Sequence, residues 1–128
     1  MRKEISKKIN IHYKIWIESS RGRGIMGDGK WRLLEMIQKK GSLSAAAIEF
    51  GISYRKAGGD IKKAEYLLGS LLIDRQRGGA YGGFSNLTEF GEKMLILYQS
   101  FHHKMDRIFD KEVTEVEVFF NKLKSKKK

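Results

Sequence analysis

The sequence predicts a mainly helical α+β fold: a winged helix-turn-helix with an N-terminal strand or hairpin and a long C-terminal helix. Three observations lead to this prediction. The turn sequence GIS at residues 51–53 separates a short alanine-rich segment from a basic amphipathic one. A glycine-rich stretch, GGAYGG at residues 78–83, lies between two short strand-like runs. From Phe90 to Leu123, apolar residues then recur at intervals of three and four, which is typical of an amphipathic helix.

Residues 1–90 are expected to form the winged domain with its N-terminal strand, followed by a helix over residues 88–124 and a basic tail over residues 125–128. Large apolar residues alternate with mostly polar ones from Ile9 to Ile17. A period of two is typical of a strand with one buried face. The turn-rich sequence SSRGRG follows, and the apolar pair IM at residues 25–26 is a candidate for a short partner strand.

Two helices are predicted next. Asp28 is the expected N-cap of a helix through the sequence GKWRLLEMIQKK, and Gly41 is expected to end it in a left-handed conformation. Ser42 and Ser44 are candidate caps for a second, shorter helix over about residues 45–50.

The third helix and the turn before it complete the predicted helix-turn-helix. Close packing of two short helices requires small residues, here Ala46 and Ala47, and a turn with positive φ, here Gly51. Ser53 is expected to cap a helix that ends near Leu68. An ordinary helical hairpin is the alternative interpretation. The predicted inward positions of the third helix are Ala57, Ile61, Ala64 and Leu68.

The charge balance indicates an anionic partner. The chain has 26 Lys and Arg residues against 15 Asp and Glu, a formal net charge of +11. Such an excess favours nucleic acid first and an anionic membrane surface second.

A glycine-rich loop without a binding role is the alternative for the predicted wing. The residues expected to contact double-stranded DNA are Ser44, Ser53, Tyr54, Arg55, Lys56, Lys62, Lys63, Arg75, Arg77, Gly79 and Tyr81.

The C-terminal helix is expected to begin after Thr88 and to carry an apolar seam like that of a coiled coil. The apolar pattern slips by one residue between Ile108 and Phe109, so the seam is interrupted once. A strand over residues 113–120 remains an alternative, because this stretch is rich in β-branched residues. We expect the seam to join two copies into a homodimer through Phe101, Met105, Ile108, Phe109, Val113, Val116 and Phe120.

Enzymatic and metal chemistry find little support in the sequence. The absence of cysteine excludes disulfides and thiolate metal sites. The adjacent residues His102 and His103 would point about 100° apart on a helix, which does not suit chelation of one ion. We expect no catalytic residues, no metal and no cofactor in this chain. No apolar run reaches the ~20 residues of a membrane helix, and the first residues lack the apolar core of a signal peptide, so a cytoplasmic protein without membrane contact is expected.

Three segments carry a resemblance to a known family: KIWIE, GDGKWRLLEMIQKKGSLSAAAIEFGISYRKA and DRQRGGAYGGFSNLTEFGEKMLILY. They resemble the N-terminal DNA-binding domain of the molybdate-responsive transcriptional regulators (ModE), which is related to the LysR-type winged helix-turn-helix. The resemblance implies a dimeric, sequence-specific regulator of palindromic DNA, linked to molybdate transport or metabolism. It places the start of the recognition helix at residues 53–56 and the wing arginines at Arg75 and Arg77.

Two features depart from the family's pattern. Members usually have Trp after the alanine of the SYRKA motif, whereas this chain has Gly58 and Gly59. The chain ends at Lys128, so we expect none of the C-terminal molybdate-binding domains of longer members. The alternative functions are a winged-helix module that binds protein, and a non-specific basic DNA-binding protein that senses no effector.

Overall fold

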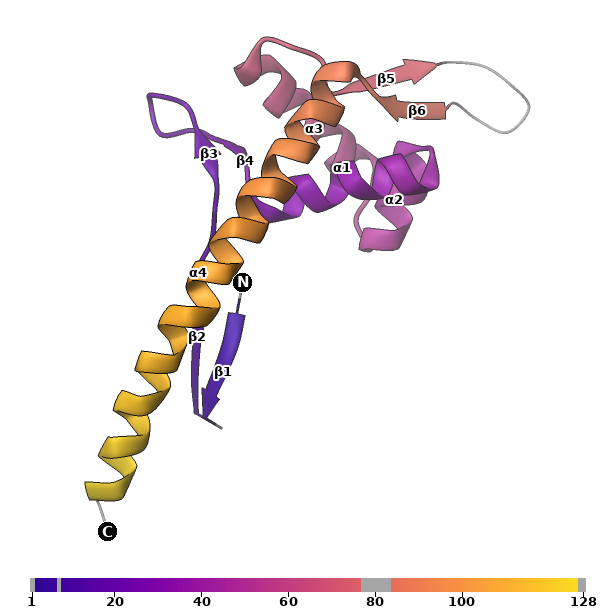
Figure 1. Ribbon diagram of the computed structural model, residues 1–128. Coiled ribbons are helices and arrows are strands. Elements are labelled where there is room, and N and C mark those ends of the chain that lie inside the picture. The colour runs from indigo at the N-terminus through magenta and orange to yellow at the C-terminus, as the bar shows by residue number, and fades with distance from the viewer. Residues whose placement is uncertain (1, 7, 77–83, 127–128) are drawn as a thin grey trace. The chain divides into compact units, whose positions relative to one another are not determined.

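The computed structural model describes residues 2–6, 8–76 and 84–126, and the chain divides into two compact units. We call Ile15–Tyr98 the core unit, and Met1–Lys14 with Gln99–Lys128 the terminal unit. No described helix is both long and apolar enough to cross a bilayer. In chain order the elements are β1 (Arg2–Ser6), β2 (Ile9–His12), β3 (Ile17–Glu18), β4 (Gly24–Met26), α1 (Asp28–Lys40), α2 (Leu43–Phe50), α3 (Tyr54–Leu68), β5 (Ile73–Gln76), β6 (Phe84–Leu87) and α4 (Glu89–Lys126) (Figure 1).

The described strands form three separate antiparallel pairs: β1 with β2, β3 with β4, and β5 with β6. In the core unit, the β5–β6 pair and the first turns of α4 follow the three helices α1–α3, which is the order of a winged helix (Figure 1). Ile73 pairs with Leu87 and Gln76 with Phe84. The two strands predicted on either side of the glycine-rich stretch are therefore confirmed.

Local capping determines where α2 and α3 begin and end. The Ser42 Oγ accepts a hydrogen bond from the Ala45 amide at 3.0 Å, and the Ser53 Oγ accepts one from the Lys56 amide at 3.0 Å. Gly51 ends α2 with φ of 68°, a left-handed conformation that costs glycine little. These residues carry out the roles that the sequence predicts, whereas the other candidate cap, Ser44, lies inside α2.

The start of α1 differs from the prediction. Gly27 occupies the N-cap position, and Asp28 is the first helical residue. The Asp28 carboxylate accepts a hydrogen bond from the Tyr98 hydroxyl, and the Tyr98 ring stacks on Trp31 with centroids 3.9 Å apart. The predicted N-cap is therefore wrong, because Gly27 holds that position. Asp28 instead joins α1 to α4 within the core unit.

Small residues allow the helices of the core unit to approach one another. Ala46 on α2 and Ala57 and Ala64 on α3 have no exposed surface, as expected for the inner faces of a helix-turn-helix. A closer approach occurs at Gly91, where an added Cβ would lie 2.1 Å from the Leu72 carbonyl oxygen. The first turn of α4 thus packs directly on the backbone that enters β5.

Thr88 connects the same two segments. Its hydroxyl donates to the Leu71 carbonyl at 2.6 Å and accepts from the Gly91 amide at 3.0 Å. The Thr88 amide donates to the Leu72 carbonyl at 3.0 Å. The predicted cap of the last helix is confirmed, and it also fixes the end of the wing.

The terminal unit consists of the β1–β2 hairpin and α4 from Gln99 onward. The predicted strand over residues 9–17 is divided, because Tyr13–Trp16 are not paired in a sheet, although exposure still alternates along the whole segment. Its partner β1 was not predicted. Tyr13 donates a hydrogen bond to Asp106, and its ring lies 4.7 Å from that of Phe109.

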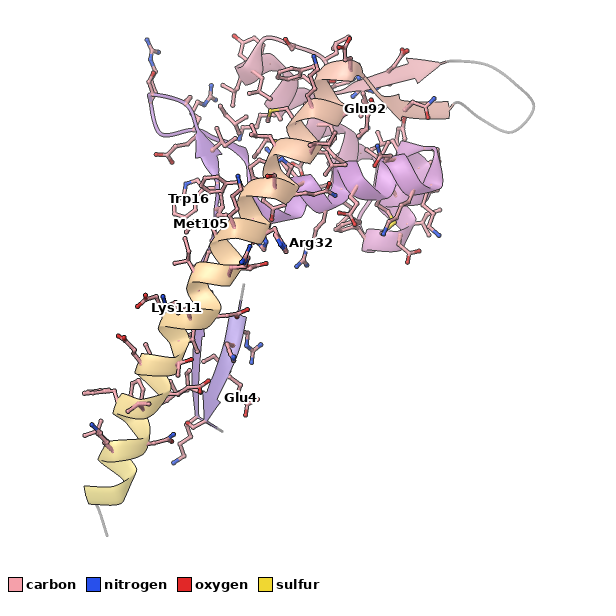
Figure 2. The ribbon with its side chains drawn as sticks, viewed as in Figure 1. Glu4, Trp16, Arg32, Glu92, Met105 and Lys111 are labelled. Atoms are coloured by element: carbon pink, nitrogen blue, oxygen red, sulfur yellow. The ribbon has the colours of Figure 1, made fainter. Side chains whose placement is uncertain are left out.

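Helix α4 is continuous through residues 113–120, so the alternative of a strand there is wrong. Of the β-branched residues in this stretch, Val113 is 1% exposed and packs in the interior, whereas Val118 is 48% exposed. The side chains of Glu4 on β1 and Lys111 on α4 project outward (Figure 2).

Candidate nucleic-acid interface

Helix α3 has a buried face and a basic face. Ala57, Ile61 and Ala64 are fully buried, and they fix the rotation of the helix about its axis. That rotation leaves the predicted DNA-contacting residues of α3 and its cap exposed. They are Ser53, Tyr54, Arg55, Lys56, Lys62 and Lys63.

The exposed cationic side chains of α3 form two rows. Arg55, Gly59 and Lys62 follow one another at intervals of four and three, and Lys56 and Lys63 lie one position further around the helix. Gly59 is two positions before Ile61 and so lies almost opposite the buried face. Cationic side chains therefore flank Gly59 on both sides, and the middle of the outward face has no side chain.

The glycine pair does not serve the packing of the chain itself. An added Cβ at Gly59 would meet nothing within 4 Å, and one at Gly58 would make an ordinary contact, 3.6 Å from the Leu43 side chain. Neither glycine has a positive φ, and α3 runs through both without a break. Each costs a helix about 1 kcal/mol relative to alanine.

Glu65 is the buried acid of α3, with 7% of its surface exposed. Its Oε2 accepts hydrogen bonds from the Leu72 amide at 2.7 Å and the Ile73 amide at 3.3 Å. Its Oε1 lies 3.5 Å from the Arg75 guanidinium. The carboxylate therefore joins α3 to the start of β5. Sequence reasoning missed this role, although an acid four positions after Ile61 on the inward side was a usable signal.

The predicted wing contacts divide into two groups. Arg75 lies on β5 with its side chain 30% exposed and paired with Glu65, so part of its role is to hold the wing strand on α3. Arg77, Gly79 and Tyr81 lie outside the described residues. Ser44 is exposed in the first turn of α2. Contact of any of these residues with DNA stays a prediction.

Lys30 is a basic residue beside α3 that the sequence did not single out. It lies in the first turn of α1, and its Nζ donates to the Ile25 carbonyl at 3.0 Å. Burial lowers the pKa of Lys30; Asp60 acts in the opposite direction, and Lys63 and Lys56 lower it further. The periodicity of α1 does not single out Lys30, because the charged groups that act on it belong to α3.

The predicted dimerisation residues occupy two faces of α4. Val113 is interior to the terminal unit, and Phe109 packs on Tyr13. Phe101 and Ile108 are 50% and 55% exposed. Phe101 and Ile108, before the predicted interruption, are thus exposed, whereas Phe109 and Val113, after it, pack on the chain's own residues. Association of two copies through these residues stays a prediction. The remaining members, Met105, Val116 and Phe120, are partly buried.

The histidines do not form a metal site in the part of the chain that the structure describes, where no group of three or more potential ligands is found. His102 instead pairs with Asp106, with 3.0 Å between its Nδ1 and Oδ2. The same carboxylate accepts from Tyr13, so this cluster joins α4 to the segment after β2.

The region that contains the helix-turn-helix matches a known protein family. Residues 29–92, half of the chain, match the lysR family of bacterial regulatory helix-turn-helix proteins. The chain belongs to this family. The matched region begins with α1 and ends in the first turn of α4, so it covers the helix-turn-helix and the wing strands. Members of this family are DNA-binding transcription regulators.

Curated relatives agree with the resemblance read from the sequence. Over 78 residues the chain is 37% identical to the transcriptional regulator ModE of Yersinia pestis and 35% identical to the dual regulator ModE of Escherichia coli K12, covering 61% of this chain and 30% of each relative. It is 38% identical over 73 residues to the molybdenum-pterin-binding protein MopB of Rhodobacter capsulatus, covering 57% of this chain and 27% of that protein. The chain spans about a third of the length of these relatives. The predicted likeness to the ModE DNA-binding domain is confirmed.

Solved structures confirm the fold. The DNA-binding domain of CbnR, solved in complex with DNA, superposes with a TM-score of 0.58 at 20% identity and covers 71% of this chain and 99% of that domain. ArgP from Mycobacterium tuberculosis superposes with a TM-score of 0.50 at 20% identity, over 64% of this chain and 29% of that protein. The predicted α+β winged helix-turn-helix is correct.

Proposed function

We propose that the chain is a sequence-specific DNA-binding transcriptional regulator of the ModE type that acts in the cytoplasm as a homodimer on a palindromic operator. The observation that carries the proposal is the outward face of α3. Four cationic side chains, Arg55, Lys56, Lys62 and Lys63, are exposed on one helix of a winged fold. A major groove is wide enough to admit such a helix, and base edges in it carry a distinct pattern of donors and acceptors.

The names of the relatives support a link to molybdate. Regulators called ModE and molybdenum-pterin-binding proteins share the helix-turn-helix region with this chain. We propose that the genes it controls serve molybdate transport or metabolism. Because the match covers only the DNA-binding part of those relatives, we assign no molybdate-binding residues to this chain.

The exposed face of α4 supports the homodimer. Phe101, Ile108 and Phe119 expose about half of their surfaces, at 50%, 55% and 59%. Large apolar surfaces in water are typical of interfaces. A two-fold dimer would present two α3 helices to half-sites about one turn of DNA apart, ~34 Å, which is the reason to expect a palindrome.

Selection of bound sequences from a random duplex pool tests the proposal. We expect a palindromic consensus and binding that weakens steeply as salt rises, with a slope of log affinity against log salt near −5 if about six phosphates are neutralised. A pool that yields no consensus, with affinity that depends on salt alone, would support the non-specific basic protein. Affinity that is weak and flat in salt would support the protein-binding module.

Arg55→Ala sharpens the test. Arg55 lies in the first turn of α3 and is exposed, where a side chain reaches base edges when the helix lies in the major groove. We expect the variant to lose preference at one base position at a cost of about 1–3 kcal/mol in specific binding. Lys39→Ala is the matched control, because Lys39 lies in the last turn of α1 and pairs with Glu35 at 3.4 Å. Equal losses on consensus and random duplex would assign Arg55 to the phosphates instead.

A further inference from the structure

Lys30 is held in place by the fold and is not a freely moving surface lysine. Its ammonium donates to the Ile25 carbonyl of β4 at 3.0 Å, and the side chain is partly buried. Both β4 and α1 pack against α3. The backbone therefore fixes the ammonium at the edge of the basic face, although Lys30 belongs to another helix.

Lys30 lies within electrostatic range of three charged side chains of α3. The charged groups that act on Lys30 are Asp60, Lys63 and Lys56, all on α3, and burial together with the two lysines lowers the pKa of Lys30 against the opposing effect of Asp60. Asp60 is itself engaged with Lys56, at 3.4 Å between Nζ and Oδ2. One carboxylate cannot neutralise three lysines, so an excess of positive charge remains where the fold restricts one of them. A bound anion would relieve this repulsion.

We propose that Lys30, with Lys56 and Lys63, forms a binding site for a backbone phosphate of duplex DNA at this edge of α3. The inference rests on the proposed DNA-binding function and adds a residue of α1 to it. The Lys30 ammonium has three donors, and the Ile25 carbonyl takes one, so two remain for phosphate oxygens. A helix in the major groove has sugar-phosphate backbones on both sides. The row of Arg55 and Lys62 faces one side, and the Lys30 site faces the other.

The salt dependence of DNA binding by the full chain tests the site. We expect Lys30→Ala to reduce the slope of log affinity against log salt by about 0.9 and to weaken binding about three- to tenfold, equally on consensus and random duplex. Lys30→Arg should retain the wild-type slope. Lys39→Ala, which removes the same charge from the other end of α1, should leave both the slope and the affinity close to wild type.

A second variant separates binding from folding. Lys30→Gln keeps a donor for the Ile25 carbonyl while removing the charge, so a slope reduced in Lys30→Gln at an unchanged melting temperature supports the site even where Lys30→Ala is unstable. A wild-type slope in a folded Lys30→Gln variant would overturn the site and leave the proposed function intact. A wild-type chain that binds no duplex would overturn both.

Discussion

The core unit and the terminal unit differ sharply in how they bury apolar side chains. In the core unit, residues from α1, α2, α3, both wing strands and the start of α4 form one hydrophobic cluster, with Leu34, Ile37 and Ile61 fully buried. In the described part of the terminal unit, Val113 is the one large apolar residue that is buried to a similar degree. The core unit therefore has one continuous hydrophobic core, whereas the described part of the terminal unit buries far less, and both units expose large apolar side chains.

The two units also contain residues with different expected roles. Buried contacts of the core unit, such as Gly91 on Leu72 and Glu65 on the Leu72 and Ile73 amides, connect α4 and α3 to the start of β5. The terminal unit has exposed Phe101, Ile108 and Phe119 on α4. We expect changes in the first group to affect folding and DNA binding together, and changes in the second group to affect association alone.

Gly91→Ala should have the largest effect. Its Cβ would lie 2.1 Å from the Leu72 carbonyl oxygen, a backbone atom that can move only if β5 moves with it. We expect a loss of about 3 kcal/mol in the free energy of unfolding, measured by denaturant titration. Gly29→Ala is the matched control, because Gly29 also lies in the first turn of a helix and its added Cβ would meet nothing within 4 Å. A stable Gly91→Ala variant would show that α4 does not pack on Leu72 this closely.

Changing the outward face of α4 should have the next largest effect, and on association alone. We expect Ile108→Glu combined with Phe119→Glu to weaken the dimer at least about tenfold, because two exposed apolar side chains would become charged at the interface. Sedimentation equilibrium at micromolar concentration measures this, with Asp110→Ala as a control, because Asp110 is exposed on the opposite side of α4 from Ile108. The melting temperature of the core unit should not change. A wild-type chain that sediments as a 14.8 kDa monomer would contradict the dimer.

Local signals made much of the core unit predictable from sequence. Ser42, Gly51 and Ser53 act through hydrogen bonds and backbone angles within a few residues, so the bounds of α2 and α3 follow from short motifs. The inward positions Ala57, Ile61 and Ala64 follow from helical periodicity alone. The same periodicity predicted α4 but assigned residues of two different faces to one apolar seam. The pattern could not show that the β1–β2 hairpin belongs to the same unit as α4 from Gln99 onward.

The features that sequence reasoning missed depend on contacts between distant segments. The Asp28 carboxylate bonds with Tyr98, the Glu65 carboxylate with the Leu72 amide, and Lys30 lies beside α3. In the sequence, each of these residues is indistinguishable from an ordinary helix cap or surface charge. A partner on another element produces no pattern in the neighbouring residues. For the candidate interface, the basic residues of α3 were therefore predictable, and the contribution from α1 was not.

Gly59→Ala should have the smallest effect on stability. We expect it to change stability and DNA affinity in opposite directions. Alanine is favoured over glycine in a helix by about 1 kcal/mol, and the added Cβ would meet nothing within 4 Å, so we expect the free energy of unfolding to rise. We expect affinity for the consensus duplex to fall several-fold, because the methyl group would occupy the middle of the face that approaches the bases. Fluorescence anisotropy with labelled duplex measures this loss.

Gly58→Ala is the matched control for Gly59→Ala. It makes the same propensity change one residue away, but its Cβ would lie 3.6 Å from Leu43 on the α2 side of the helix. We expect it to gain stability and to bind DNA as the wild type does. If Gly59→Ala binds equally well, the bases do not approach α3 at its centre. In that case the flanking cations would hold the helix further from the groove floor, and Arg55 would be the residue long enough to read a base.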